Sequence, residues 1–338
     1  MQFSFDERQL EFRAQLRALA EKLCPPSELR ASWESANGWS EDRWRALAEL
    51  GVTGLTVPEE HGGLGLGFVD LVLLLEEAGR SGLPEPLLDT VAVGVPLLAG
   101  LSSDDGRALA GEWLPRVTTG DAVIGVADPA APSRVRAGSQ LALVWKNGTL
   151  LAAPTADTNP VELGSADGAS RLWELPLLDV ATTGLADRPD AEALARESTD
   201  RGSTAAAAVL VGVAERLITM AAEYAKERVQ FGKPIGSFQA VKHHLATAFV
   251  RLEFARPVVY RAAWAIDARE PTVSRDASMA KSMASDAASL AARVALQIHG
   301  AIGYTWEHDL HLWVKKAWSM GVAWGDAGTH RRRALDEL

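Results

Sequence analysis

The sequence has 338 residues, of which 47% are apolar and 23% are charged, and its formal net charge is −10. At roughly 150 residues per domain, this length predicts about two domains with a large buried core. The acidic balance argues against the basic surface of a nucleic-acid-binding protein. A single cysteine, Cys24, excludes an internal disulfide framework and a cysteine zinc site, and it fits the reducing cytoplasm.

No segment reads as a targeting signal or a membrane span. The N-terminal segment MQFSFDERQ lacks a basic start followed by an apolar core, so no secretory signal is expected. The longest apolar run, Ala205 to Ala214, has about half the length of a membrane span. We expect this run to be a buried helix and the protein to make no membrane contact.

Residues 1–119 are predicted to be helical. Ser40, followed by Glu41 and Asp42, is a good N-cap with acidic first-turn residues. The apolar run 71–75 predicts another helix, which Gly79 would close.

The texture changes to short strands over residues 120–198. Val- and Leu-rich runs alternate with Gly, Pro, Asn and Asp, as in AVIGVA, LALVW and TLLAA. The segment Trp145 to Thr149 contains Asn-Gly, the pair that favours a tight hairpin turn. This region is predicted to be a small β domain.

Helical texture returns over residues 199–338. Apolar residues recur at helical spacing in three stripes, which are Val209, Val213, Leu217, Met220 and Tyr224; Val241, Leu245, Phe249 and Leu252; and Met279, Met283, Leu290 and Val294. Long helices with short Gly/Pro breaks predict a helical bundle. The fold is therefore expected to be mainly α with a small middle β domain.

Three stretches resemble the acyl-CoA dehydrogenase family and span most of the chain. They are LAELGVTGLTVPEEHGGLGL at 47–66, ERVQFGKPIGSFQAVKHHLA at 227–246 and QIHGAIGYTWEHDLHL at 297–312. The resemblance implies an N-terminal helical domain, a middle β domain, and a C-terminal four-helix domain that mediates oligomerisation. It also implies FAD as the cofactor, shared between two subunits, with an acyl-CoA substrate and an electron-transfer flavoprotein as the acceptor.

The second stretch carries an arginine suited to a phosphate. Arg228 lies near a helix end before a Gly-Lys-Pro turn, where its guanidinium can pair with a phosphate, although a salt bridge to Glu223 or simple solvation would also explain it. The resemblance assigns Arg228 to the pyrophosphate of a neighbouring subunit's FAD. It assigns further cofactor contacts to Phe231, Phe238 and Gln239, with core packing as the alternative for Phe238.

The third stretch supplies Gln297, Gly300 and Ala301 as further cofactor residues by resemblance. Glycine at a helix end lets the backbone approach a diphosphate closely, and it can equally cap the helix. The family usually has two adjacent glycines here, whereas this chain has Gly300 followed by Ala301. Glu307, His308 and His311 have metal-ligand spacing, but no partner ligands are evident, so no metal is expected.

The family's reaction removes an α-proton from an acyl-CoA thioester, which needs a carboxylate base in a desolvated pocket. Relatives place this glutamate at one of two positions, and ungapped counting from the motifs lands on Trp324 and Gly202. Neither residue can accept a proton. Asp326 and Asp200 lie within two residues of these positions and are weak substitutes, because aspartate is one methylene shorter and small displacements are costly.

The β domain also departs from the family. Thr-Glu-Pro of relatives is replaced by Ala127-Asp128-Pro129, and the domain is shorter. The preferred hypothesis is an FAD-sharing subunit of a hetero-oligomer, whose homologous partner chain supplies the glutamate, as in actinobacterial heterotetramers that degrade steroid side chains. The alternatives are a self-sufficient homo-oligomeric dehydrogenase that uses Asp326 or Asp200, and a structural subunit without flavin.

Overall fold

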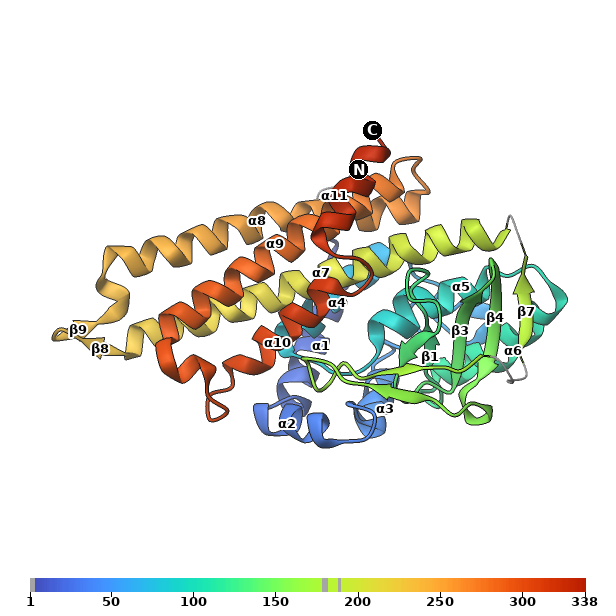
Figure 1. Cartoon of the computed structure of the whole chain (residues 1–338), viewed down its shortest axis with the longest axis horizontal. Helices are drawn as coiled ribbons and strands as arrows, with labels where there is room; N and C mark the ends of the chain where they lie inside the picture. The colour runs from blue at the N-terminus through green and yellow to red at the C-terminus, as the bar shows by residue number, and fades with distance from the viewer. Residues whose placement is uncertain (1–3, 178–181, 188–189) are drawn as a thin grey trace.

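The computed structural model describes residues 4–177, 182–187 and 190–338, so the first three residues of the N-terminal segment lie outside it. Helices dominate these described residues, and a small β region lies at one side of the long helices (Figure 1). This architecture confirms the predicted fold class, mainly α with a small middle β domain.

The N-terminal part is helical as predicted. Its elements are α1 (Glu7–Leu23), α2 (Pro26–Glu34), α3 (Glu41–Glu49), the 3-10 turn η1 (Glu59–His61), α4 (Phe68–Ser81), the π-helix η2 (Leu88–Gly94), α5 (Val95–Ala99) and α6 (Asp104–Thr118). Ser40 caps α3, because its side chain accepts a hydrogen bond from the backbone N–H of Arg43.

Gly79 does not close α4, so that prediction was wrong. The helix continues to Ser81 and ends at Gly82, whose φ of 75° lies in the left-handed region. Gly79 instead allows close packing against the long helix α7 (Asp190–Glu227), since a Cβ there would lie 2.0 Å from the carbonyl oxygen of Val209. The glycine serves helix contact rather than helix termination.

The β region consists of two small sheets. The first has the order β1-β3-β4-β7, and its strands are β1 (Ile124–Val126), β3 (Leu141–Lys146), β4 (Thr149–Pro154) and β7 (Thr183–Ala186). The second has the order β2-β6-β5, and its strands are β2 (Arg134–Arg136), β6 (Leu172–Glu174) and β5 (Val161–Leu163). The predicted hairpin is confirmed: Asn147 and Gly148 join β3 to β4, both with positive φ.

The C-terminal part is a helical bundle. After α7 come the small hairpin β8 (Val229–Gln230) and β9 (Lys233–Pro234), the turn η4 (Ile235–Ser237), α8 (Gln239–Ala268), α9 (Val273–His299), the turn η5 (Gly300–Tyr304), α10 (Leu310–Val322) and α11 (Ala327–Asp336). Helix α7 begins at Asp190, so helical structure starts before residue 199, where the sequence predicted the return of helices.

The core of the bundle is α7, which packs against α9, α4 and α8 (Figure 1). Every residue from Ala205 to Ala214 is buried, as predicted. By length and composition alone, α7 could cross a membrane, but 67% of its most apolar window is buried inside the fold. Alanine and glycine let neighbouring helices approach α7 closely, so its apolarity is that of a core helix.

Candidate functional site

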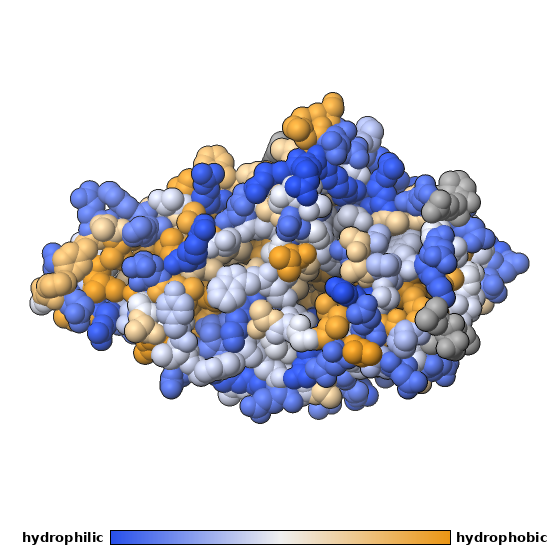
Figure 2. All heavy atoms as spheres, in the orientation of Figure 1, coloured by the Kyte–Doolittle hydropathy of each residue, from blue (hydrophilic) through white to orange (hydrophobic). Residues whose placement is uncertain are grey.

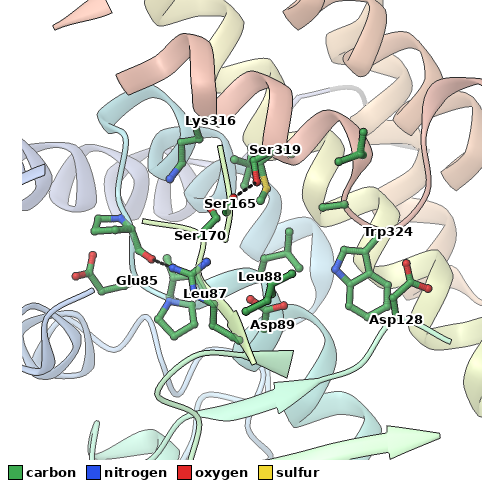
Figure 3. A pocket seen from close by; sticks show the side chains of 18 of the residues that line it. Glu85, Leu87, Leu88, Asp89, Asp128, Ser165, Ser170, Lys316, Ser319 and Trp324 are labelled. Atoms are coloured by element: carbon green, nitrogen blue, oxygen red, sulfur yellow. Dashed lines mark hydrogen bonds between the residues drawn. The ribbon is translucent and has the colours of Figure 1, made fainter. Parts of the chain in front are cut away.

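A cavity of about 490 Å³ lies between the N-terminal helices, the β region and the end of α10. Figure 3 shows side chains from the segment before η2, from the β region and from the C-terminal part converging on it. Most of its walls are aliphatic, and a smaller number of charged and hydroxyl side chains face the same space. An apolar pocket with a few polar groups is the usual form of a small-molecule site.

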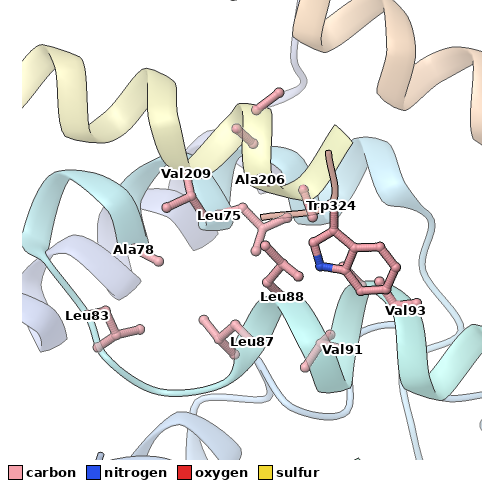
Figure 4. Close-up of a cluster of buried hydrophobic side chains, with 14 of the residues drawn as sticks. Leu75, Ala78, Leu83, Leu87, Leu88, Val91, Val93, Ala206, Val209 and Trp324 are labelled. Atoms are coloured by element: carbon pink, nitrogen blue, oxygen red, sulfur yellow. The ribbon is translucent and has the colours of Figure 1, made fainter. Parts of the chain in front are cut away.

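The two positions expected to carry the catalytic glutamate contact each other at the wall of this cavity, although only Trp324 lines it. Trp324 lines it, and the indole ring lies against Gly202 of α7, where an added Cβ would be 2.2 Å from the ring. Figure 4 shows the indole beside α7, among the aliphatic side chains around Leu88. Residues far apart in sequence therefore converge on one point, and an aromatic ring occupies that point.

The backbone around Trp324 is held by buried polar contacts. Its φ of 56° lies in the left-handed region, which is unusual for a bulky residue. Nε2 of buried His330 donates to the Trp324 carbonyl oxygen at 2.6 Å, and burial lowers the pKa of this imidazole to about 4. Lys281 Nζ donates to the carbonyls of Met320 and Gly321, just before the tryptophan. Burial lowers the pKa of Lys281 to about 7.

Neither substitute aspartate is placed to act as a base in the cavity. Asp200 is buried, forms an ion pair with Arg333 at 2.7 Å and accepts a hydrogen bond from Ser274. Asp326 is the N-cap of α11, where its side chain accepts from the backbone N–H of Thr329 at 2.7 Å, and this bond lowers its pKa. Neither lines the cavity. Both aspartates therefore have structural roles.

The charged groups that do line the cavity were missed by sequence reasoning. They are Glu85, Asp89, Asp128, Arg136 and Lys316, with Arg134 at the rim. Burial raises the pKa of each of the three carboxyl groups. Asp128 stands in the Ala127-Asp128-Pro129 stretch that replaces Thr-Glu-Pro of relatives, but it was not predicted to line a site. No motif marks the other residues, because they come from separate elements, although Asp89 is a carboxylate within a mostly apolar run.

The segment that resembles the FAD motif lies at the far end of α7. Arg228, Phe231 and Gln239 are exposed, Phe231 to 92%, and Phe238 is half-buried. Arg228 makes no ion pair with any described residue, so the alternative of a salt bridge to Glu223 is not realised. Figure 2 shows hydrophobic side chains gathered around this hairpin end. The arginine is free to meet a ligand or another chain.

Gln297, Gly300 and Ala301 lie at the same end and are exposed. The ring of His299, which ends α9, stacks on Tyr224 of α7 at 4.4 Å, and this contact joins the two helix ends. Gly300 has a φ of 65°, and a Cβ built there would have no neighbour within 4 Å. Its backbone is therefore open to close approach, as a diphosphate requires.

The residues at the exposed end of the bundle, Arg228 and Gly300, fit the phosphates of a flavin dinucleotide, whereas the cavity at Trp324 lies elsewhere in the fold. The guanidinium of Arg228, which has no ion pair within the described ranges, and the open glycine turn at Gly300 suit the phosphates. At about 1.5 Å per residue, α7 separates Gly202 from Arg228 by roughly 40 Å, which is beyond the reach of one dinucleotide. At the cavity, the indole of Trp324 occupies one of the two positions where ungapped counting placed the family's glutamate.

Comparisons with known proteins agree with this architecture. The family profile "Acyl-CoA dehydrogenase, N-terminal domain" matches residues 6–121, and "Acyl-CoA dehydrogenase, C-terminal domain" matches residues 193–338. The chain is 35% identical over 319 residues to acyl-CoA dehydrogenase IpdE2 of Mycobacterium tuberculosis, covering 92% of this chain and 91% of the relative.

Two solved structures of complexes share the fold. A chain of a Tcur3481-Tcur3483 steroid ACAD variant has a TM-score of 0.84 and 26% identity, covering 98% of this chain and 97% of that one. A chain of the ChsE4-ChsE5 complex from Mycobacterium tuberculosis has a TM-score of 0.86 and 24% identity, covering 100% and 99%. The chain belongs to the acyl-CoA dehydrogenase family of FAD-dependent oxidoreductases, which act on CH–CH bonds.

Proposed function

We propose that this chain is an FAD-sharing subunit of a hetero-oligomeric acyl-CoA dehydrogenase and that a homologous partner supplies the catalytic glutamate. The observation that carries the proposal is the contact between Trp324 and Gly202. A base is needed where these residues meet, and neither side chain can take a proton. The substitute aspartates are committed to an ion pair and to a helix cap.

The exposed end of the bundle supports the second half of the proposal. Arg228 projects from the chain without an ion-pair partner among the described residues, and Gly300 leaves its backbone open. A guanidinium in this state suits the pyrophosphate of a cofactor seated in a neighbouring subunit. The chain would then contribute phosphate binding to a site whose base and flavin-ring pocket belong to the partner.

The solved relatives suggest what that partner would be. The Tcur3481-Tcur3483 and ChsE4-ChsE5 structures each join two differently named chains, and the former is called a steroid ACAD. By analogy, the partner is a second acyl-CoA dehydrogenase chain and the substrate is a bulky steroid-derived acyl-CoA. From the family resemblance rather than from these two structures, the proposal includes a cytoplasmic location and an electron-transfer flavoprotein as the electron acceptor.

Within this proposal the bound FAD would accept the hydride lost from the substrate. The residues of this chain would bind and orient the cofactor's phosphates at Arg228 and Gly300. The chain's own cavity would contribute no proton acceptor at Trp324. The partner's carboxylate would remove the α-proton in a pocket closed to water, where its pKa is raised toward neutrality.

Co-expression with a homologous partner chain tests the proposal. The lone chain is expected to purify with little FAD and no turnover, whereas the co-purified complex carries FAD and oxidises an acyl-CoA. Replacing the partner's glutamate by glutamine should abolish turnover while FAD remains bound. A lone chain that holds stoichiometric FAD and reduces it with an acyl-CoA would overturn the proposal and favour a self-sufficient enzyme.

A further inference from the structure

The cavity contains a buried guanidinium that lacks an ionic partner. Arg136 of β2 is only 6% exposed and lines the cavity. Its Nη2 donates to the carbonyl oxygens of Pro84, at 2.6 Å, and Ala169. Its Nη1 has no hydrogen bond to a described residue, and no carboxylate of the described residues lies within 4 Å of the guanidinium.

A buried cation without a partner is costly, since desolvation of an ion removes several kcal/mol that only a counter-charge restores. Neighbouring carboxylates reduce this cost from a distance. Asp89 has the largest such effect on Arg136, ahead of Asp167 and Glu85. Glu85 is already bonded to Arg43, with 2.6 Å between its Oε1 and the arginine Nε, so it does not turn to Arg136. Nε of Arg136 also lacks a hydrogen-bond partner among the described residues, but it is fully buried, so Nη1 is the donor left to a molecule in the cavity.

The opposite walls suit an apolar body. The apolar part of the cavity wall is drawn in Figure 4 and consists of Leu75, Leu83, Leu87, Leu88, Val209 and the indole of Trp324. A cavity of about 150 Å³ is enough to hold benzene. The volume of about 490 Å³ therefore leaves room for a body of two or three fused rings.

We propose that this cavity is a non-catalytic binding site for a compact amphipathic acid, an alicyclic or aromatic carboxylate whose charged end is held by Arg136. The inference rests on the proposed function in one respect: with no base at Trp324, this cavity is not used for the reaction of a thioester and is open to another ligand. The apolar body of the ligand packs against the aliphatic walls, and its carboxylate supplies the missing counter-charge.

Other charged groups facing Arg136 set the selectivity of the site. Asp89 lines the same cavity, and its side chain has no hydrogen bond to another described residue. Its negative charge opposes a second carboxylate nearby. Lys316 adds little attraction, because its Nζ donates to the carbonyls of Gly82 and Leu83 and lies 3.9 Å from Asp167. Removing the charge of Asp89 should therefore favour the acid.

Calorimetric titration of the purified chain with adamantane-1-carboxylate and adamantane-1-carboxamide tests the site. The two probes share a compact apolar body and differ in charge. We expect the carboxylate to bind at least tenfold more tightly and Arg136→Gln to abolish this preference. Arg45→Gln is the control and should keep the preference, because Arg45 is half exposed and does not line the cavity. Equal binding of both probes to the native chain would overturn the inference.

A second variant keeps the test decisive if Arg136→Gln does not fold. Asp89→Asn should strengthen carboxylate binding about threefold to tenfold and leave carboxamide binding unchanged. Unchanged carboxylate binding would contradict the inference. If the probe titration contradicts this inference, the proposed function is not affected, because that function is tested by the FAD content and turnover of the co-expressed complex. Conversely, turnover by the lone chain would refute the proposed function without changing the probe titration.

Discussion

The indole of Trp324 rests on the Cα of Gly202, so closely that an added Cβ would lie 2.2 Å from the ring. Each residue is locally unfavourable where it stands. Glycine in a helix interior costs roughly 0.5–1 kcal/mol relative to alanine. A non-glycine residue with a φ of 56° costs roughly 1–2 kcal/mol. The contact between them explains the glycine, because any side chain at position 202 would displace the indole of Trp324.

Gly202→Ala should therefore destabilise the chain, although alanine is the better helix former. The methyl group would displace the indole, and overpacking of this kind costs about 1–3 kcal/mol. Urea unfolding measures the loss. Gly111→Ala is the control, because Gly111 lies within α6 with no atom within 4 Å of an added Cβ. That variant should gain about 0.5–1 kcal/mol.

The double variant Gly202→Ala/Trp324→Ala separates contact from helix propensity. If the methyl group is harmful because it meets the indole, Gly202→Ala should become neutral or stabilising once the indole is gone. The coupling energy of this mutant cycle should be at least about 1 kcal/mol. Simple additivity of the two substitutions would show that the contact does not determine the glycine.

Substitutions of Asp200 and Asp326 should change the stability of the chain to different extents and should leave turnover of the complex nearly unchanged. Asp200→Asn removes the charge of a buried carboxylate and leaves partly buried Arg333 without its ionic partner, so a loss of about 1–3 kcal/mol is expected. Asp326→Asn should change stability by less than about 0.5 kcal/mol, since asparagine is an equally good N-cap, whereas Asp326→Ala should cost about 1 kcal/mol. Turnover of the co-expressed complex, measured per folded protein, should stay within twofold for both asparagine variants. A hundredfold loss in either would restore that aspartate as a base.

Arg228→Ala should lower the FAD content of the complex without affecting assembly. The guanidinium is exposed and has no ion pair among the described residues, so its loss costs the fold little. Arg228→Lys should bind FAD at an intermediate level, because lysine keeps the charge but loses the planar fork. FAD absorbance per complex is the readout. Arg196→Ala, an exposed position near the other end of α7, is the control and should retain full FAD.

Sequence patterns predicted the parts of this chain whose structure is local. The Asn-Gly hairpin follows from two backbone conformations, and the N-cap at Ser40 follows from one side chain. Gly79 was misjudged because its reason lies in α7, a separate segment that packs against it. Asp89 and Arg136 were not predicted to line the cavity for the same reason, because separate segments bring them together. Ungapped counting found Trp324 and Gly202 one by one, but only the fold places them in contact.

Acid should destabilise the chain through the buried histidine that holds the Trp324 carbonyl. The pKa of His330 is lowered from 6.5 to about 4 by burial, so between these values the unfolded chain binds a proton that the folded chain does not. The contribution of His330 to stability is thus complete above pH 6.5 and is lost as pH falls toward 4. Lowering the pH from 7.5 to 5.5 should remove about 1.4 kcal/mol through this residue.

His330→Gln should weaken this dependence on pH. Glutamine can still donate to the Trp324 carbonyl, but it does not titrate, so the variant should lose stability at pH 7.5 and show a flatter decline toward pH 5.5. His311, whose pKa burial also lowers to about 4, should retain its own share of the decline. Urea unfolding at pH 7.5, 6.5 and 5.5 gives the slopes. His243→Gln, at an exposed position on α8, should keep the native slope, and an equally steep slope for His330→Gln would mean that this imidazole is not buried in its neutral form.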